Sequence, residues 1–351
     1  MPLCVSSLKR RIKMKKIIVL GATGHLGCYT ALHLAEQGNR VVAVGHRKSD
    51  NGFFATKGIE YIGDFALENK ECYKLLPTDV DAVVHLAGAM PAHVGTSPMP
   101  YIQSIIVGMV NLCEWLKVTR CRRMVFNTTP SDVAQFFGTD VPVKDDAPRS
   151  FPKDGGDHAI YAIAKNTAVD ILEHYNIAYG IKSCIFRHLT VYGYHPNPYY
   201  VLNGVKKMLP YRFLMQQAID GETINIWGNP NYKKELLYIK DFTLAVSLAV
   251  DSDVTGIFNL SGDRPYTMEE QVQGFIDVFS PKEHKSSKTY SPDKPSTPQN
   301  LLDSTKARII LGWQPQYDWW EACEDMKKDM EKEPMALLWG RKDDYGEIMA
   351  R

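Results

Sequence analysis

The chain has 351 residues, of which 44% are hydrophobic and 23% are charged, as in an ordinary soluble globular protein. Its 41 lysines and arginines nearly balance its 40 acidic residues, and a net charge of +1 offers no basic surface for nucleic acid or an anionic membrane. No apolar run is long enough to cross a bilayer, and the length predicts one large domain or two closely joined ones.

Residues 1–13 form a stretch with a basic end that lacks the apolar core of a secretory signal peptide. Because Met14 begins a natural start, MKKIIVLGATG, we interpret residues 1–13 as a disordered N-terminal extension, with an organelle transit peptide as the alternative. The seven cysteines form no CxxC motif and pair with no histidine at ligand spacing. This pattern indicates reduced thiols in a cytoplasmic protein without a metal site.

The next residues read as strand, tight turn, helix and strand. Ile17 to Leu20 is a continuous apolar run, as expected of a strand buried on both faces of a parallel sheet. Apolar residues then recur at helical spacing until Gly38, and Val41 to Val44 begin another buried strand. Similar apolar strands recur in VDAVVHLAG, CRRMVFNTT and IKSCIFRHL, separated by helical patterns. This alternation predicts an α/β fold with a Rossmann-type, doubly wound parallel sheet.

The composition changes after about residue 190. The segments YGYHPNPYYVLNG and HKSSKTYSPDKPSTPQN are rich in proline and polar residues, which is typical of loops. We therefore predict a dinucleotide-binding domain over residues 14–190 and a smaller, interleaved region over residues 191–351 that mainly binds the substrate. A strand near residues 256–262, GIFNLSG, is expected to return to the sheet.

A glycine-rich turn, GATGHLG, joins the first strand to the first helix. One glycine would permit the tight turn, one would let the backbone approach a pyrophosphate, and one would allow close packing of strand and helix. The free N–H groups of the following helix would attract the anion. A purely structural turn is the alternative to a dinucleotide site. The residues assigned to this dinucleotide loop are Gly21, Thr23, Gly24, His25, Leu26 and Gly27.

The end of the second strand bears on the choice between NAD and NADP. NAD sites usually place a carboxylate there to hold the ribose 2′-hydroxyl. Gly45 occupies that position, and His46, Arg47 and Lys48 follow it. Without the carboxylate and with cations nearby, a 2′-phosphate becomes tolerable. We therefore favour NADP over NAD, with Arg47 as the contact, against the alternative of a solvated basic loop.

Further motifs stand in a fixed order along the chain: IGDF, VVHLAG, FNTT, YAIAK, FRHLTVYG, NIWGNPNYKKELLYIKD, FNLSGDRPYTMEE and LLDSTKARIILGWQP. Together with GATGHLG they resemble the extended short-chain dehydrogenases/reductases of the NAD-dependent epimerase/dehydratase family, and especially the UDP-hexose 4-epimerases. The likeness covers Met14 to about residue 320. Such an ordered set is far more specific than any one of its motifs.

The resemblance implies three catalytic residues. Tyr161 would be the general acid/base, and Lys165, one helical turn later, would hold the nicotinamide ribose. A free tyrosine with a pKa of about 10 is a poor base at neutral pH, so its phenolate would need the positive charges of Lys165 and oxidised nicotinamide. Thr129 would bond to the reacting oxygen, with Thr128 as a possible substitute.

The resemblance also implies further contacts with the cofactor. Asp64 would face the adenine, the strand-end backbone after residue 85 would follow the cofactor, and His188 would contact cofactor or substrate. The residues assigned in this way are Asp64, Phe65, Leu86, Ala87, Gly88 and His188.

The remaining histidines have simpler interpretations. His85 ends a buried strand and is expected to be a packed, hydrogen-bonded residue. His93 and His195 lie in loops. No histidine, cysteine and carboxylate cluster has metal-ligand spacing, so we expect no metal. The absence of a Gly-x-Ser-x-Gly motif counts against a hydrolase.

Three reactions fit this set of residues. Dehydratases of the family carry an Asp-Glu pair after the catalytic threonine, and Pro130 and Ser131 here count against dehydration. An epimerase, the favoured hypothesis, would oxidise a sugar hydroxyl and reduce the keto intermediate from its other face. A carbonyl or keto-sugar reductase is the alternative that Gly45 and Arg47 favour, because epimerases recycle a tightly held NAD⁺. A non-catalytic NADP(H) sensor is less favoured, since both YAIAK residues are present.

A nucleotide sugar is the expected substrate, and Thr129, Thr190 and Lys234 are its expected contacts. Thr190 replaces a common asparagine, and Lys234 stands where an arginine often holds the diphosphate. Lysine can neutralise phosphate but lacks the bidentate fork of arginine. Two long, apolar helical segments are those through which the family often dimerises, so we expect a homodimer.

Overall fold

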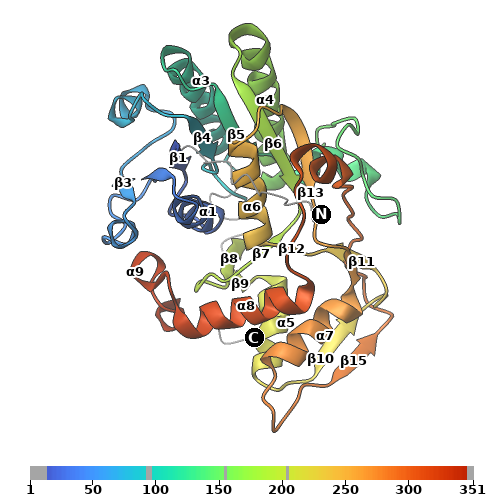
Figure 1. Ribbon diagram of the computed structural model, residues 1–351. Helices are drawn as coiled ribbons and strands as arrows, with labels where there is room; N and C mark the ends of the chain where they lie inside the picture. Colours follow the sequence, from blue (N-terminus) through green and yellow to red (C-terminus); the bar gives the residue numbers. More distant parts are fainter. Residues whose placement is uncertain (1–13, 92–96, 154–155, 203–204, 346–351) are drawn as a thin grey trace, which may run out of the picture.

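The computed structural model describes residues 14–91, 97–153, 156–202 and 205–345 (Figure 1). The predicted extension, residues 1–13, and His93 lie outside these residues. The centre is a seven-stranded sheet in which every neighbouring pair is parallel. Its strands, from edge to edge, are β13 (Gly256–Leu260), β6 (Lys182–His188), β5 (Arg123–Asn127), β4 (Ala82–His85), β1 (Lys16–Leu20), β2 (Arg40–Val44) and β3 (Glu60–Ile62). This confirms the Rossmann-type α/β prediction.

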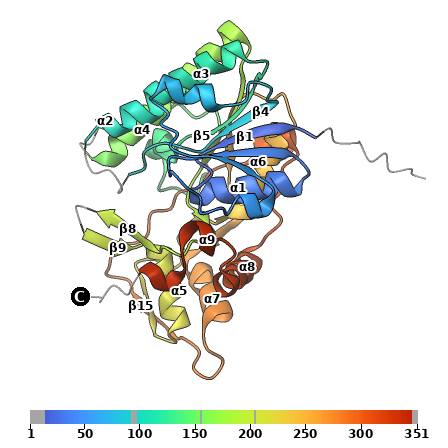
Figure 2. The ribbon, with the colours of Figure 1, turned by 90° about the vertical axis from the view of Figure 1, so that its left-hand side faces the viewer.

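Two helical layers bury the two faces of the sheet (Figure 2). Ile17 and Val19 share a core with α1 (His25–Glu36) and α6 (Ile239–Val250), whereas Ile18 and Leu20 share one with α3 (Gly108–Val118) and α4 (Asp157–Tyr179). Successive strand residues point to opposite faces, so a strand covered on both sides is apolar throughout. In the described residues no helix combines the length and apolarity that crossing a membrane requires.

The helix before β5 is interrupted by a wider turn. It begins as α2 (Met99–Tyr101), continues as a π-helical turn over Ile102–Val107 and ends as α3. Such π turns are rare overall, and those that do occur are often found at functional sites. This turn places Gln103 and Ser104 beside the carboxyl end of β4, where the Ser104 hydroxyl accepts from the backbone N–H of Ala89.

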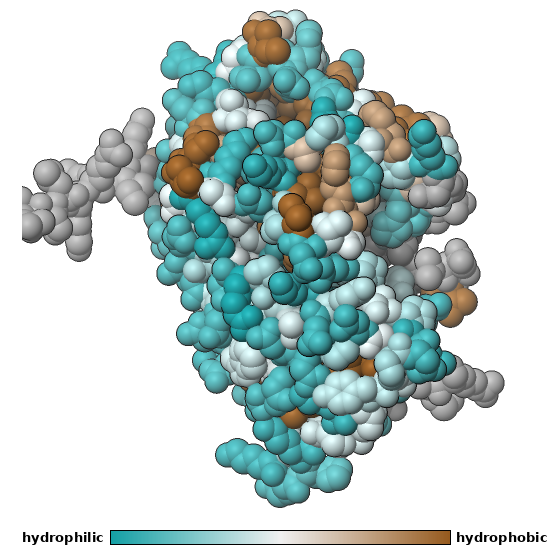
Figure 3. Space-filling model, turned by 90° about the vertical axis from the view of Figure 1, so that its right-hand side faces the viewer, coloured by the Kyte–Doolittle hydropathy of each residue, from teal (hydrophilic) through white to brown (hydrophobic). Residues whose placement is uncertain are grey.

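Apart from α6 and β13, most of the described residues after β6 form a second layer below the sheet (Figures 1 and 2). Its longer helices are α5 (Pro210–Ile219), α7 (Met268–Phe279) and α8 (Trp319–Lys332), followed by the short α9 (Ala336–Trp339). Four strand pairs accompany them: β7 (Val191–Tyr192) with β12 (Leu237–Tyr238), β8 (Tyr199–Leu202) with β9 (Val205–Met208), β10 (Ile224–Trp227) with β15 (Lys288–Ser291), and β11 (Lys233–Glu235) with β14 (Pro265–Thr267). On the face in Figure 3, exposed apolar side chains gather mainly over the upper, sheet-containing half.

Candidate active site

The glycine-rich turn after β1 is held by contacts that leave no room for side chains. Gly21 has a φ of +85°, and a Cβ there would lie 2.8 Å from the backbone nitrogen of Ala87. A Cβ on Gly27 would collide with the carbonyl oxygen of Gly21. Gly24 precedes α1, whose N-terminus has no side-chain cap. The first N–H groups of α1 can therefore receive an anionic group of a ligand.

A cavity of about 420 Å³ opens where β1, β2 and β4 end. Among the residues predicted for a cofactor, Gly21, Phe65, Ala87 and Gly88 line it. Asp64 and Leu86 are neighbours of lining residues but do not line the cavity themselves. Sequence reasoning missed several lining residues from the helix start before β5 and from the loops after β2 and β3, namely His46, Glu68, Pro100, Gln103 and Ser104.

Buried polar atoms without a partner gather at the next strand ends. In the described structure no group bonds to Nδ1 of His85, Oδ1 of Asn127, Oγ1 of Thr128 or Nε2 of His188. Burial lowers the pKa of His85 to about 3 and that of His188 to about 4, so both rings are neutral. Unpaired buried polar atoms are costly, and a polar ligand across these strand ends would satisfy them. The residues present therefore fit a dinucleotide.

Tyr161 and Lys165 lie on one face of α4 against the end of β5. They are only 7% and 3% exposed. Lys165 Nζ donates to the carbonyl oxygen of Asn127 at 2.9 Å and lies 5.8 Å from the centre of the Tyr161 ring. The Tyr161 ring packs edge-on against Tyr101 at 6.2 Å. The helical spacing of YAIAK thus brings the pair to the end of the strand that precedes Thr129.

The electrostatics of this pair differ from the sequence-based expectation. Burial raises the pKa of Tyr161, and Tyr101 raises it further, whereas Lys165 has no resolved effect on it. Burial also lowers the pKa of Lys165 to about 7. Desolvation disfavours both charged forms, so a half-neutral lysine cannot favour the phenolate strongly. The protein alone therefore keeps Tyr161 as a phenol.

Thr129 and Thr128 follow β5 with different hydroxyl environments. Thr129 Oγ1 donates to Ser131 Oγ at 3.2 Å and accepts from the Ser131 N–H at 3.3 Å, at the start of the short helix η4 (Pro130–Phe136). The hydroxyl of Thr128 is buried and has no partner in the described structure. Thr128 is therefore at least as well placed as Thr129 to bond to a ligand.

A buried ion pair fixes the segment after Thr129. Arg187 donates to the two carboxylate oxygens of Asp132 at 2.9 and 2.7 Å, and both side chains are fully buried. Arg187 also donates to Asn259 Oδ1 of β13 at 3.1 Å. These bonds join the segment after β5 to strands β6 and β13. Asp132 was missed in the sequence because nothing local marks it as buried.

The remaining residues that were predicted to contact the cofactor lie in several different environments. Arg47 donates to the carbonyl oxygen of Leu338 at 2.8 Å, in the C-terminal segment. The indole of Trp339 donates to the carbonyl oxygen of Thr23 at 2.8 Å, and the His25 ring packs against Trp339 rather than facing the cavity. Leu26 is half-buried against the core that α1 shares with α6.

Of the three residues predicted to contact the substrate, Thr129 follows β5, and the other two lie in the second layer or beside it. Thr190 is exposed, between β6 and β7. Lys234 on β11 is half-buried, and burial lowers the pKa of its amine to about 8. Within the described structure it forms no ion pair, so its charge is available to an anion. No group of three or more possible metal ligands occurs among the described residues.

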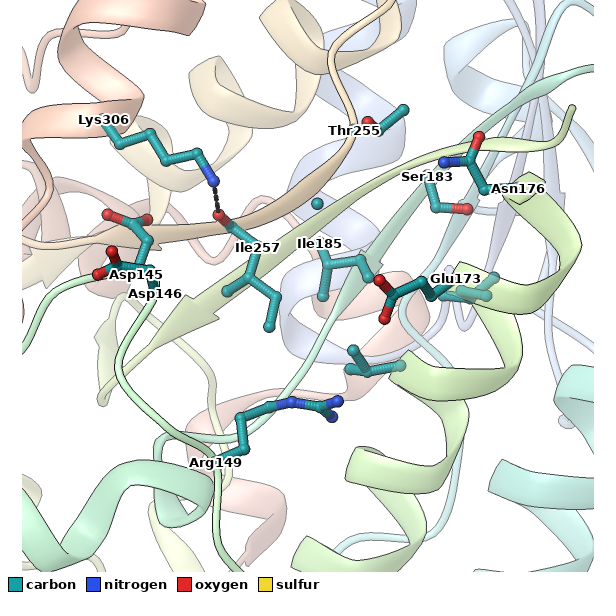
Figure 4. Close-up of a pocket in the computed structure, with 13 residues that line it drawn as sticks. Asp145, Asp146, Arg149, Glu173, Asn176, Ser183, Ile185, Thr255, Ile257 and Lys306 are labelled. Carbon is teal, nitrogen blue, oxygen red and sulfur yellow. Dashed lines mark hydrogen bonds between the residues drawn. The ribbon is translucent and has the colours of Figure 1, made fainter.

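A second cavity, of about 310 Å³, lies between α4 and the edge strand β13 (Figure 4). Its two basic lining residues are engaged in structural bonds: Lys306 donates to the carbonyl oxygen of Ile257 (Figure 4), and Arg149 pairs with Asp170. None of the residues predicted for cofactor or substrate lines it. We therefore place the candidate active site at the strand ends.

Comparisons with known proteins identify the family of the chain. The model of the NAD dependent epimerase/dehydratase family matches residues 17–261. The chain is 24% identical over 322 residues to UDP-glucuronic acid decarboxylase 5 of Arabidopsis thaliana, covering 90% of this chain and 89% of that protein. It is also 24% identical over 321 residues to the UDP-glucose 4-epimerase of Lacticaseibacillus casei, covering 86% and 92%.

Solved structures share the fold. The UDP-N-acetylglucosamine 4-epimerase of Methanobrevibacter ruminantium M1 is 19% identical with a TM-score of 0.72, covering 92% of this chain and 100% of that one. The UDP-glucose 4-epimerase of Thermus thermophilus, solved with NAD, is 20% identical with a TM-score of 0.67, covering 89% and 98%. Since the family model matches well over half of the chain, the protein belongs to the NAD-dependent epimerase/dehydratase family.

Proposed function

We propose that the protein is a nucleotide-sugar epimerase that works through a transient keto form of the sugar, with Tyr161 as the acid/base. The observation that carries this proposal is the burial of Tyr161 and Lys165 together at the end of β5. Tyr101, which packs on Tyr161, lies between Pro100 and Gln103 of the dinucleotide cavity. The pair therefore lies near the side of the cavity that Pro100 and Gln103 line.

Each chemical role can be assigned to a residue. Tyr161 would take the proton of a sugar hydroxyl and later return it. Lys165, held by the Asn127 carbonyl, would bind the ribose hydroxyls of the cofactor, and Thr129 or Thr128 would donate to the reacting oxygen. When bound, oxidised nicotinamide would supply the hydride acceptor and the positive charge that favours the Tyr161 phenolate.

We propose NAD as the cofactor, and the predicted preference for NADP gains no support. The family is NAD-dependent, and the neighbour from Thermus thermophilus was solved with NAD. Gly45 also has a packing reason to lack a carboxylate, because a Cβ there would lie 2.8 Å from the Tyr61 hydroxyl and 3.0 Å from the Thr23 side chain. The Arg47 guanidinium, moreover, already bonds to Leu338.

The second layer would hold the nucleotide sugar. We propose that residues 14–190 bind the cofactor and that residues 191–351 mainly bind the substrate, with the unpaired charge of Lys234 on the diphosphate. We also propose a homodimer through α3 and α4, at whose ends Val118 and Ile177 are exposed. Sedimentation at micromolar concentration would measure the mass of the assembly.

Decarboxylation of a UDP-uronic acid is a second candidate. It is favoured because several curated relatives, such as that from Arabidopsis thaliana, are UDP-glucuronic acid decarboxylases. A keto group two bonds from a carboxylate makes loss of carbon dioxide easy. The same oxidation of a sugar hydroxyl, with NAD⁺ as the hydride acceptor and Tyr161 as the base, would therefore serve both reactions. The NADPH-dependent reductase and the non-catalytic sensor remain distinguishable from both by their products.

Turnover of defined nucleotide sugars would test the proposal. Purified protein with NAD would be incubated with UDP-glucose, UDP-N-acetylglucosamine and UDP-glucuronic acid, and the products would be identified by NMR. We expect a 4-epimer without net consumption of cofactor, lost in Tyr161→Phe and kept in Tyr179→Phe, a tyrosine exposed at the end of α4. A pentose product would establish the decarboxylase, stoichiometric NADPH oxidation the reductase, and cofactor binding without turnover the sensor.

A further inference from the structure

A third cavity, larger than the two described above, lies in the second layer. It measures about 640 Å³ and is lined by one face of α5, by residues around β8 and β9, and by the C-terminal segment that ends in the short helix η6 (Lys342–Tyr345). It shares no lining residue with the dinucleotide cavity. This volume lies within the range of about 300 to 1,000 Å³ that is usual for small-molecule sites.

Arg212 of α5 is the buried charge in this cavity. The residue is only 7% exposed, yet none of the described carboxylates pairs with it. Asp220 and Asp343 also line the wall, but Asp220 accepts from Gln216 at 3.0 Å instead. Arg187, which is also buried, has Asp132 as its partner. An arginine stays charged in a protein, so a buried one without a counter-ion is costly.

Two buried histidines lie near Arg212 without balancing its charge. Burial lowers the pKa of His25 to about 3 and that of His195 to about 4, and the nearby charge of Arg212 contributes to both shifts. Lys342 adds a second cation to the wall. The two neutral histidines offer Arg212 no counter-charge, and the lining carboxylates Asp220 and Asp343 form no ion pair with it. The guanidinium can therefore pair with an anion that enters the cavity.

The rest of the wall is aromatic and apolar. Tyr194 and Tyr199 lie on one side, and the Arg212 guanidinium carbon lies 5.9 Å from the centre of the Tyr194 ring. Met208 and Met330 complete the apolar wall. Guanidinium groups bind phosphate through paired hydrogen bonds, and tyrosine rings stack on planar groups. We propose that this cavity binds a nucleotide-sized organic phosphate, with the phosphate on Arg212 and the ring against the tyrosines, separately from the sites for cofactor and substrate.

Calorimetric titration of the full chain would test this site. The protein would first be saturated with NAD and UDP-glucose, so that nucleotides cannot enter those sites. AMP, UMP and inorganic phosphate would then be titrated separately. We expect one further equivalent of a nucleoside monophosphate, bound at least tenfold more tightly than phosphate. Arg212→Gln would weaken this binding at least tenfold, and Arg40→Gln, on an exposed arginine of β2, would leave it unchanged.

Three outcomes would overturn the proposal: no further equivalent, an equivalent that survives Arg212→Gln, or one that Arg40→Gln also removes. Circular dichroism would establish that the variants are folded. If Arg212→Gln does not fold, Arg212→Lys keeps the charge but loses the fork, and its weaker binding would carry the same test. The readout is binding rather than turnover, so failure of the epimerase proposal would leave this result interpretable.

Discussion

At Lys165, burial disfavours the charged form of an amine to which we assign a catalytic role. Its amine is nearly inaccessible, it bonds to the Asn127 carbonyl, and burial lowers its pKa to about 7. The unfolded chain holds the proton up to a pKa of about 10.4. Below pH 7 both states are protonated and the folded state bears the full penalty of a buried charge. As the pH rises from 7 toward 10 the penalty disappears, so the contribution of Lys165 to stability increases.

Lys165→Met is therefore expected to raise the melting temperature at pH 6 while abolishing turnover. Each pKa unit corresponds to about 1.4 kcal/mol, so the gain is on the order of a few kcal/mol. At pH 9 the gain should shrink, because the wild-type lysine is then neutral. Melting curves at both pH values would measure it, with Lys70→Met at an exposed site as the control. An equal change at pH 6 and pH 9 would contradict the burial argument.

Substitution of two glycines in the first turn is expected to have different effects: one should weaken NAD binding and the other should lower stability. Gly24→Ala adds a Cβ whose nearest neighbour is the Gly21 oxygen at 3.4 Å, an ordinary contact, so the melting temperature should change little. The added methyl would stand where a pyrophosphate approaches the backbone, and NAD affinity should fall at least tenfold. Gly27→Ala creates a collision with the same oxygen and should lower the melting temperature by several degrees.

Melting curves without ligand and fluorescence titration with NAD would measure the two effects. Loss of stability in Gly24→Ala, or unchanged NAD affinity in that variant, would show that the turn serves packing alone. The sequence-based alternative of a purely structural turn would then be preferred.

At the scale of elements, the segment from β5 into η4 depends on one buried pair. Asp132→Asn would leave the Arg187 charge without its partner, and breaking a buried pair costs about 3 to 5 kcal/mol. Urea unfolding would measure this loss. The matched control is Asp170→Asn, whose partner Arg149 is partly exposed and whose loss should cost at most about 1 kcal/mol. Similar losses of unfolding free energy in the two variants would mean that the buried Asp132 pair contributes no more to stability than the partly exposed Asp170 pair.

The elements that could be predicted from the sequence are those marked by a pattern of neighbouring residues, such as an apolar run or a helical spacing. Ile17 to Leu20 could be identified as a buried strand because both faces of that strand are covered, and YAIAK could be placed on a helix by its spacing. The π-helical turn over Ile102–Val107 has no comparable signal, and neither has the burial of Asp132. Both depend on packing between segments that are distant in the sequence.

At the scale of the whole molecule, the C-terminal segment closes on the dinucleotide loop (Figure 1). The centres of the Trp339 and His195 rings lie 4.4 Å apart, and the Trp339 indole donates to the Thr23 carbonyl. Asn51, beyond β2, donates to Leu337 at 3.0 Å. These contacts join segments that are far apart in the sequence, so no local pattern could predict them. The bond from Arg47 to the Leu338 carbonyl belongs to the same set of contacts and likewise has no local signal.

This arrangement predicts how two variants affect cofactor binding. Trp339→Ala removes the bond to Thr23 and should weaken NAD binding at least tenfold by loosening the loop, whereas Trp227→Ala, at an exposed tryptophan of β10, should have no effect. Arg47→Ala removes the bond to Leu338. If Arg47 serves to anchor the C-terminal segment, this variant should weaken NAD and NADP binding by the same factor, as fluorescence titration would measure. A selective loss of NADP binding would instead assign Arg47 to a 2′-phosphate and restore the preference that the sequence suggested.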